Sequence, residues 1–447
     1  MDLLNHRIRN ARCFGHYRRP SRVLLVMTIA TACVAACGVE TDATAASNDA
    51  IVLQWNEIAV ETVGATPPFP STRAMAAVQV AVFEAVNAIT RRYQPYLGSI
   101  NASSTASVEA ATIVAAHDAL VWLFPGQQAL LDARMNTSLL PIVDGAAKEE
   151  GIAVGRAAAA AIIANRTNDG AQSPTFYTPA SIAPYEWQPT PSCVNPPANG
   201  RGLFLHWQLV KPFGVEGSAQ FRANPPPALV SGKYANDLDE LQAVGGKDST
   251  LRAEDRAAVA LLYAAQPPHR GWNLVARQLA AERGPNELTR TARTFAILNM
   301  SLSDAHITVF ESKYFYRTWR PETAIVRADE DGNHRTAASA SFQPFVTTPC
   351  FPGYPSAHGA GGGAARTVLE RAYGRRGHDI TIVDAGAPGI VLHYADLRTI
   401  TDDVSDARVY GGIHFRYDQE AGERMGVEIG RYNDEHRLLP LDPGDDY

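Results

Sequence analysis

Prolines divide this chain and limit where its helices can lie. Between residues 167 and 232 they recur at positions 174, 179, 184, 189, 191, 196, 197, 212 and 225–227. A proline inside a helix removes a backbone hydrogen bond and clashes with the preceding turn. Large aromatic residues in the same segment, among them those at 185, 187, 207 and 213, favour a loop that packs against the protein. The sequence therefore predicts a long proline-rich loop over 167–232, which we call the belt.

Helical patterns occupy both flanks of the belt. Apolar residues recur at steps of three and four, as in Met75, Val78 and Val82 behind a Ser-Thr start. The segments with helical patterns are 51–63, 71–89, 106–124 and 146–165 before the belt, and 234–243, 253–265, 272–283, 287–319, 356–373 and 414–432 after it. Strand composition is found at 379–383. The sequence therefore predicts an all-α fold of helical bundles, with helix 287–319 ending before Pro321, since proline disfavours helical geometry in the residue before it.

The N-terminus has the composition of an export signal. Six arginines precede an apolar run at 23–36, which ends in Val-Ala-Ala before Cys37. This layout predicts a signal peptide over 1–37, with Cys37 as the lipid-anchored first residue of a bacterial lipoprotein, or cleavage within 43–47 instead. We expect a polar spacer at 38–50 and a domain over 51–447 in the periplasm, on the outer membrane or outside the cell. For Cys193 and Cys350 that oxidising location leaves two states open, a disulfide or two buried thiols.

Composition excludes several classes of protein. The net charge is −6, and the sequence has no basic stripe or nucleic-acid motif, so nucleic-acid binding is not predicted. No apolar run after the N-terminus is long enough to span a bilayer. No paired-histidine helix motif or cysteine cluster indicates a zinc hydrolase.

The stretch 350–363, Cys-Phe-Pro-Gly-Tyr-Pro-Ser-Ala-His-Gly-Ala-Gly-Gly-Gly, predicts a tight turn that leads into a helix. Ser356 occupies the position of an N-cap residue. Unpaired N–H groups at a helix start form a natural seat for an oxyanion, and His358 adds an acid–base group there. The alternative interpretation is an ordinary N-cap before a helix rich in small residues.

Cations and a second histidine lie on either side of that stretch. Lys313 and Arg320 are seven residues apart, which places both on one face of the expected helix. Asp304, nine residues before Lys313, falls on roughly the opposite side, and we exclude it from the site. The alternative for the two cations is a surface role that complements the helix dipole.

The third motif contains Arg408, His414 and Asp418 around a Gly-Gly break. Asp418 follows His414 by one helical turn, so its carboxylate can hold one ring nitrogen and leave the other free as ligand or nucleophile. A structural histidine is the alternative for His414 alone. With its fork of donors, arginine suits tetrahedral oxyanions, so the three motifs together predict a site for phosphate or the related vanadate.

The motifs Lys313-x6-Arg-Pro, Pro-Ser356-x-His and Arg408-x5-His-x3-Asp resemble, in order and spacing, a known superfamily. It joins vanadium-dependent haloperoxidases with type-2 phosphatidic-acid-phosphatase-like (PAP2) acid phosphatases. The belt and segments such as Arg73-Ala-Met resemble its bacterial secreted haloperoxidase-like branch. The resemblance implies a two-bundle all-α architecture, with the active-site motifs within 250–435.

The resemblance also implies a role for each residue. His414 is expected to bond vanadate axially and His358 to handle protons of peroxide. The oxygens of vanadate would be neutralised by Lys313, Arg320, Ser356, the backbone N–H of Ala357, and Arg408. Hydrogen peroxide would then oxidise a halide to hypohalous acid, which halogenates an organic acceptor. Halide, acceptor and oligomeric state stay open.

Two alternatives use the same pocket. Phosphate could occupy it, giving a phosphomonoesterase with His414 as nucleophile and His358 as general acid, or the chain could be an envelope lipoprotein that only binds an oxyanion. The family's usual glycine is Ala357 here, which narrows the cavity by a methyl group. Phe351 matches fungal chloride-oxidising members, where algal bromide-oxidising members carry histidine. Two interpretations of Phe351 stay equally open, a wall of a dry halide pocket and an ordinary core phenylalanine.

Overall fold

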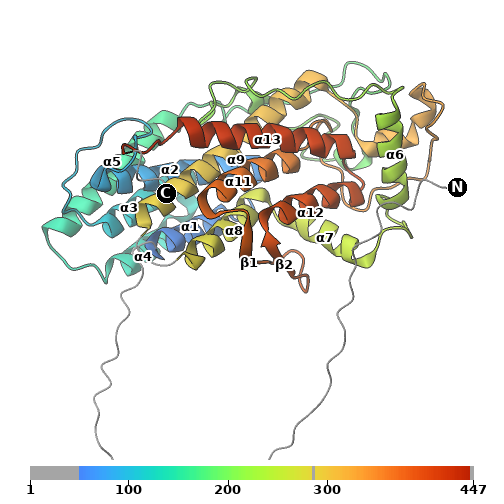
Figure 1. The fold of residues 1–447 in the computed structure, drawn as a ribbon. Helices are drawn as coiled ribbons and strands as arrows, with labels where there is room; N and C mark the ends of the chain where they lie inside the picture. Colours follow the sequence, from blue (N-terminus) through green and yellow to red (C-terminus); the bar gives the residue numbers. More distant parts are fainter. Residues whose placement is uncertain (1–49, 284–286, 443–447) are drawn as a thin grey trace, which may run out of the picture. The chain divides into compact units, whose positions relative to one another are not determined.

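Helices occupy both flanks of the belt, as the apolar periodicity predicts. The computed structural model describes residues 50–283 and 287–442. Before the belt lie α1 (Ala50–Val63), α2 (Pro68–Thr90), α3 (Val108–Leu123), α4 (Gln128–Leu139) and α5 (Ala146–Arg166). After it lie α6 (Gly232–Val244), α7 (Glu254–Ala265), α8 (Pro268–Glu282), α9 (Leu288–Tyr316), α10 (Pro321–Val326), α11 (Ala357–Tyr373), α12 (Leu397–Tyr410) and α13 (Arg416–His436). The predicted all-α class is confirmed (Figure 1).

A small hairpin joins α11 to α12. Its strands β1 (Arg376–Ile382) and β2 (Leu392–Asp396) pair antiparallel, with Ile380 opposite Tyr394. The sequence predicts β1 but misses β2, because a strand this short is recognisable only beside its partner. Short 3-10 helices lie at η1 (Pro125–Gln127), η2 (Pro191–Cys193), η3 (Leu205–Leu209) and η4 (Ala328–Glu330). The expected signal peptide and Cys37 lie outside the described residues.

Glycines allow the helices to approach closely. A Cβ atom at Gly155 of α5 would lie 2.6 Å from the carbonyl oxygen of Ala111 in α3. The same holds for α13 against α11, where a Cβ at Gly426 would lie 2.0 Å from the carbonyl oxygen of Ala360. Figure 1 shows α9, α11 and α13 side by side. The buried apolar residues form two clusters. One includes residues of α1, α2, α3, α8, α12, the first half of α9 and the second half of α11, and the other includes residues of the second half of α9, the first half of α11, and α13.

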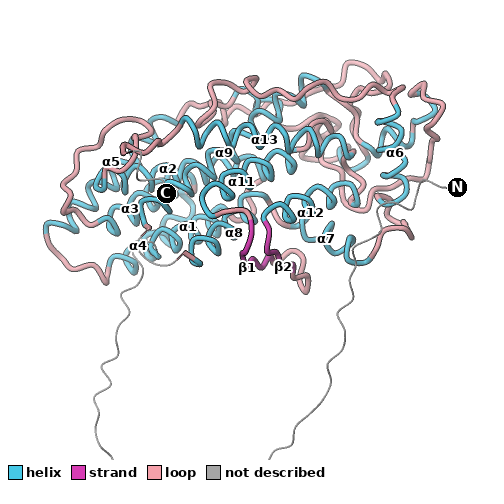
Figure 2. Tube along the Cα trace, in the orientation of Figure 1, coloured by secondary structure: helices cyan, strands magenta, loops and turns pink. Residues whose placement is uncertain are grey.

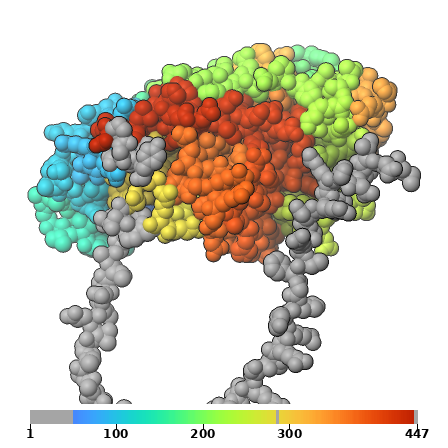
Figure 3. Space-filling view, viewed as in Figure 1, coloured from blue at the N-terminus to red at the C-terminus, as the bar shows by residue number. Residues whose placement is uncertain are grey.

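In the described chain, the belt contains η2 and η3 as its only regular elements and is otherwise loop (Figure 2). A carboxylate on α9 holds it, since Asp304 accepts the backbone N–H groups of Phe213 and Gly214 at 2.7 Å each and of Val215 at 3.1 Å. Arg437 at the end of α13 donates to the carbonyl of Gly214 at 2.7 Å. The belt therefore lies along the C-terminal helix, where Figure 3 shows green atoms beside red ones.

The predicted helix 287–319 is wrong at its C-terminal end. α9 stops at Tyr316, because Arg317 adopts a left-handed conformation with φ 51° and its N–H bonds to the carbonyl of Lys313. Arg320 follows in extended conformation, with φ −88° and ψ 157°, as the residue before α10. Lys313 and Arg320 therefore do not share a helical face, although the fold still brings both to one pocket.

Three helices are absent from the sequence prediction. α10 has only six residues, too few for an apolar stripe to be recognised, and in α4 only Leu131 is fully buried. α12 does carry one, at Leu397, Ile400, Val404 and Ala407, and could have been predicted. Among the described residues no single helix is long and apolar enough to cross a membrane, although α3 and 125–139, bent by 119°, pass that test together.

Candidate active site

Lys313 lies in the last turn of α9 and is fully buried. Its ammonium group donates to the carbonyl oxygens of Pro352 at 2.7 Å and Gly353 at 2.6 Å. Both acceptors belong to the turn that the sequence predicts before Ser356. The turn therefore orients the lysine through its backbone and not through a side chain.

Arg320 is held by the same turn. Its Nε donates to the carbonyl of Phe351 at 2.8 Å, and its Nη1 donates to the carbonyl of Ile413 at 3.0 Å. Nη1 also lies 3.0 Å from Nε2 of His414. Its Nη2 is buried and has no partner among the described residues. One end of the guanidinium is thus fixed, and the other end is free to donate.

Phe351 lies beneath both cations. Its ring centre is 5.3 Å from Nζ of Lys313 and 4.9 Å from the guanidinium carbon of Arg320. On the other side the ring packs edge-on against Phe69 and Phe310. The aromatic face attracts the two charges and at the same time excludes water from them.

His414 precedes α13, and its ring is oriented by Asp418. Nδ1 lies 2.8 Å from Oδ2 of Asp418, which also accepts the N–H of Phe415 at 3.3 Å. Because the guanidinium of Arg320 can only donate, Nε2 presents its lone pair to Nη1 and Nδ1 carries the proton toward Asp418. The predicted pairing of His414 with Asp418 is confirmed, and Nε2 faces the Arg320 guanidinium.

Ser356 caps α11, with its Oγ accepting the N–H of Gly359 at 3.2 Å, and the predicted N-cap is confirmed. Ala357 is the first helical residue and His358 the second. His358 lines a cavity of about 20 Å³, and the other lining residues are mostly apolar or aromatic: Tyr263, Gln266, Pro268, Gly271, Trp272, Val275, Ile382, Ile400 and Val404. A space of this size holds about one water-sized molecule.

Arg408 lies in the last turn of α12 and is nearly fully buried. Its Nη1 donates to the carbonyl of Tyr263 at 3.3 Å, while its Nε has no partner among the described residues. The carbonyl of Tyr263 belongs to the wall of the His358 cavity. Arg408 therefore joins the third motif to the residues that line the His358 cavity.

Positive charge exceeds negative charge in this pocket. Burial lowers the pKa of Arg320 to about 9 and of Arg408 to about 10. Burial, together with the neighbouring charge of Arg320, lowers the pKa of Lys313 well below its ordinary value. Among the described residues, Asp418 is the carboxylate that bonds His414, and burial raises its pKa to about 7 against the opposing effect of the cations.

The two histidines respond to the same field. Burial lowers the pKa of His358 and His414 well below the usual value, and the charges of Lys313, Arg320 and Arg408 lower it further. Both imidazoles are therefore neutral at pH 7. Buried cations in excess, with unpartnered donors at Arg320 Nη2 and Arg408 Nε, fit a bound anion, because an anion would offset the repulsion and accept those hydrogens.

The structure brings all nine predicted site residues to one region. These are Lys313, Arg320, Phe351, Ser356, Ala357, His358, Arg408, His414 and Asp418. Sequence reasoning missed the backbone acceptors of the turn, at Phe351, Pro352 and Gly353, and the carbonyls of Tyr263 and Ile413. No sequence pattern identifies a carbonyl by its partner. Tyr263 and Trp272 were missed because α7 and α8 carry no motif.

Comparison with known proteins supports this region and the fold around it. Residues 293–439 match the family model of the VCPO second helical-bundle domain. A vanadium chloroperoxidase from Curvularia inaequalis is 23% identical, with 48% of this chain and 46% of that protein covered, so the match spans less than half of its length.

Two solved structures are similar in fold. One is described as the first bacterial vanadium-dependent iodoperoxidase, with a TM-score of 0.74 and 24% identity, covering 88% of this chain and 98% of that one. The other is a holo-type bacterial vanadium-dependent chloroperoxidase, with a TM-score of 0.66 and 17% identity, covering 84% and 95%. Residues 293–439 thus match the VCPO second helical-bundle domain, and the chain shares its fold with two solved bacterial vanadium haloperoxidases.

Proposed function

We propose that this chain is a vanadate-dependent peroxidase that oxidises a halide with hydrogen peroxide and releases hypohalous acid. The observation that carries the proposal is the buried excess of positive charge around Nε2 of His414. Lys313, Arg320 and Arg408 supply that charge, and two of the three guanidinium and ammonium groups retain an unpartnered N–H donor in the described structure. Vanadate is a tetrahedral oxyanion whose negative charge would offset the positive charge of these groups.

The residues present fit that group. His414 would hold it through Nε2, because Asp418 keeps the proton on Nδ1. Arg320 and Arg408 would donate to its oxygens through the nitrogens that have no partner, and the N-terminus of α11 at Ser356 adds a partial positive charge. When bound, vanadate supplies a Lewis acid that polarises peroxide toward attack by halide.

His358 is suited to accept a proton. The cationic field and burial lower its pKa, so at neutral pH its ring is an unprotonated base that can take a proton from peroxide entering the adjoining cavity. The apolar wall formed by Trp272, Val275 and Ile400 keeps bulk water from that step. His358 therefore moves the proton while the cations hold the anion.

A phosphomonoesterase is the second candidate, and the neutral Nε2 of His414 favours it as a nucleophile toward phosphorus. That reaction also needs a protonated acid for the leaving group. In the anion-free pocket the lowered pKa leaves His358 unprotonated at neutral pH, and the fold shared with bacterial vanadium haloperoxidases favours the peroxidase. Export is part of the proposal, supported by the disulfide between Cys193 and Cys350, because disulfides persist in oxidising compartments.

The proposal is tested with protein freed of phosphate and divided into samples with and without orthovanadate. Each sample is assayed for peroxide-dependent halogenation of a dye with chloride, bromide or iodide, and for hydrolysis of an aryl phosphate. We expect vanadate-dependent halogenation that His414→Ala abolishes and that phosphate suppresses. Aryl phosphate turnover that vanadate inhibits, without halogenation, would assign the phosphatase instead, and inactivity in both assays would leave an oxyanion-binding protein.

A further inference from the structure

One segment of the belt contacts both loops that carry the site. We call residues 185–193 the strap. At its first end the strap pairs with the link between α9 and α10. The N–H of Trp319 donates to the carbonyl of Tyr185, and the N–H of Trp187 donates to the carbonyl of Arg317, both at 2.7 Å. Tyr185 has φ 77°, a conformation that a bulky residue holds only when its surroundings enforce it.

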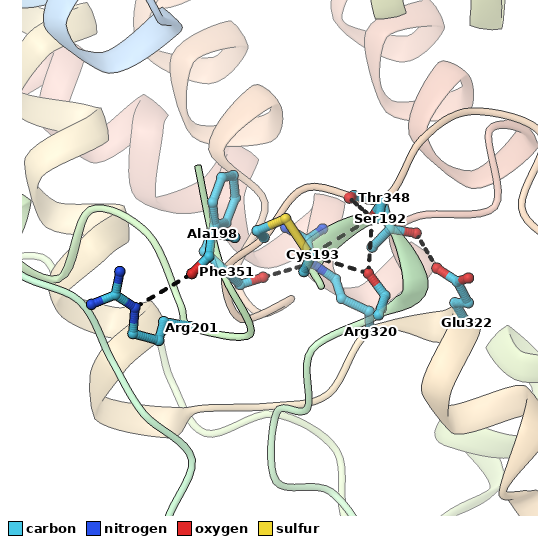
Figure 4. The surroundings of a disulfide bond; sticks show 10 residues. Ser192, Cys193, Ala198, Arg201, Arg320, Glu322, Thr348 and Phe351 are labelled. Carbon is cyan, nitrogen blue, oxygen red and sulfur yellow. Dashed lines mark hydrogen bonds between the residues drawn. A yellow bond between two sulfur atoms is a disulfide. The ribbon is translucent and has the colours of Figure 1, made fainter. Parts of the chain in front are cut away.

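At its other end the strap joins the turn before Ser356 covalently. Cys193 forms a disulfide with Cys350, 157 residues away in the chain, and has no exposed surface. Ser192 adds a hydrogen bond from its Oγ to the carbonyl of Thr348 at 2.8 Å. Figure 4 shows the disulfide between Phe351 on one side and Ser192 with Thr348 on the other. The disulfide found here resolves the two states that the sequence left open.

Each loop held by the strap supplies one half of the cationic pocket. Arg320 directly follows Trp319, which bonds to the first end of the strap. Cys350 directly precedes Phe351, whose carbonyl accepts Nε of Arg320, and the next two carbonyls accept the ammonium of Lys313. The strap is therefore bonded at one end beside Arg320, a donor, and at the other end beside the carbonyls that accept from Arg320 and Lys313. It can position both cations without lying in the pocket itself.

Besides the bond from Nε of Arg320 to the carbonyl of Phe351, two further hydrogen bonds join the two loops directly. The N–H of Gly353 donates to the carbonyl of Thr318 at 3.0 Å, and the N–H of Tyr354 donates to Oγ1 of Thr318 at 2.9 Å. Both bonds lie on the Gly353 side of the turn. On the Cys350 side, the turn is tied by the bond from Arg320 to the carbonyl of Phe351, by the disulfide, and by the N–H of Leu203, which donates to the carbonyl of Cys350 at 2.8 Å. The disulfide is the covalent tie of that side.

We propose that the Cys193–Cys350 disulfide is a positioning device for Lys313 and Arg320, and that breaking it weakens oxyanion binding. The inference rests on the proposed function only in requiring that the pocket bind an oxyanion. A trialkylphosphine and water reduce the disulfide to two thiols and give the phosphine oxide, a two-electron exchange. The freed turn then samples more positions, its carbonyls hold the two cations less well, and the charges no longer converge on one anion.

The test measures inorganic phosphate binding by calorimetry on oxidised and phosphine-reduced protein. Phosphate is the probe because reductants attack vanadate, and no peroxide is present because it would re-form the bond, two thiols and one peroxide giving a disulfide and two waters. The Cys193→Ser/Cys350→Ser double variant is measured with phosphate and with orthovanadate. Leu131→Ala, in α4 far along the chain from the site, provides a destabilised control.

We expect the dissociation constant for phosphate to rise at least about tenfold on reduction and in the double variant, and to return when the reduced protein is reoxidised. Leu131→Ala should keep its affinity within about twofold despite a lower melting temperature. Unchanged affinity in protein whose two thiols have been titrated would overturn the inference, and so would an equal loss in the Leu131 variant. If oxidised wild type binds neither anion, the proposed function fails first.

Discussion

Arg320 offers a quantitative test, because its buried charge has no carboxylate partner. Burial lowers its pKa to about 9, more than three pH units below an ordinary guanidinium. At about 1.4 kcal/mol per unit, carrying the charge costs the folded protein about 5 kcal/mol. The guanidinium stays protonated in both folded and unfolded protein at pH 7, so the cost is fully present there.

Arg320→Met removes that cost but leaves three acceptors unpaired, on Phe351, Ile413 and His414. Each unpaired buried acceptor costs about 1–3 kcal/mol. The two effects have opposite signs and similar size, so we expect the stability of the anion-free variant to stay within about 3 kcal/mol of wild type. Denaturant unfolding without phosphate or vanadate measures this.

The stabilisation that bound vanadate adds should, unlike the stability of the anion-free protein, be clearly reduced by Arg320→Met. At a vanadate concentration of about 100 times Kd, the wild-type protein gains about 2.7 kcal/mol. Losing a buried charge-assisted contact costs about 2–5 kcal/mol of binding, so at the same concentration Arg320→Met should gain less than about 1 kcal/mol. Arg73→Met is the matched control, since Arg73 is buried in an ion pair with Asp169 at 2.7 Å. It should lose stability, by about 3–5 kcal/mol, and keep the full response to vanadate. A normal vanadate response in Arg320→Met would refute this reasoning.

Two further predictions concern residues that do not line the pocket. The ring nitrogens of His117 are hydrogen-bonded to the carboxylates of Asp118 and Asp132, at 2.8 Å each. Burial alone would lower the pKa of His117, but these two carboxylates outweigh burial, so the pKa is raised. This stabilisation is complete below the ordinary histidine pKa and is lost as pH rises through the raised value. The free energy of unfolding of the wild-type protein should therefore fall relative to that of His117→Gln over that range. Parallel curves of unfolding free energy against pH for the two proteins would disprove the prediction. Gly426→Ala should cost about 3 kcal/mol or more in denaturant unfolding, because its methyl would lie 2.0 Å from a carbonyl oxygen of α11. Gly217→Ala, with open space around it, should be neutral, and equal effects would contradict the packing argument.

Local chemistry made part of the site predictable. A serine before a run of small residues signals an N-cap, and Ser356 caps α11 through its side chain. A spacing of four residues places Asp418 against His414 even though the histidine precedes the helix. In both cases the partner lies within one turn of the chain, so the sequence contains the whole interaction.

Interactions between distant segments were not predictable in the same way. The end of α9 depends on Arg317 in a left-handed conformation, which a sequence signals only when the residue is glycine or asparagine. Lys313 and Arg320 meet the pocket through carbonyl groups that every residue possesses, so composition carries no information about them. For the disulfide, the sequence could offer two cysteines 157 residues apart but not their geometry.

The central claim is that Nε2 of His414, oriented by Asp418 and surrounded by buried cations, binds an oxyanion. Calorimetric titration of orthovanadate into phosphate-free wild type, His414→Ala and His378→Ala tests it most directly, since His378 lies outside the pocket, near Glu282 on α8. The account predicts saturable binding of one vanadate to wild type and to His378→Ala, and binding weakened at least about a hundredfold in His414→Ala. Equal affinity in all three proteins would contradict it.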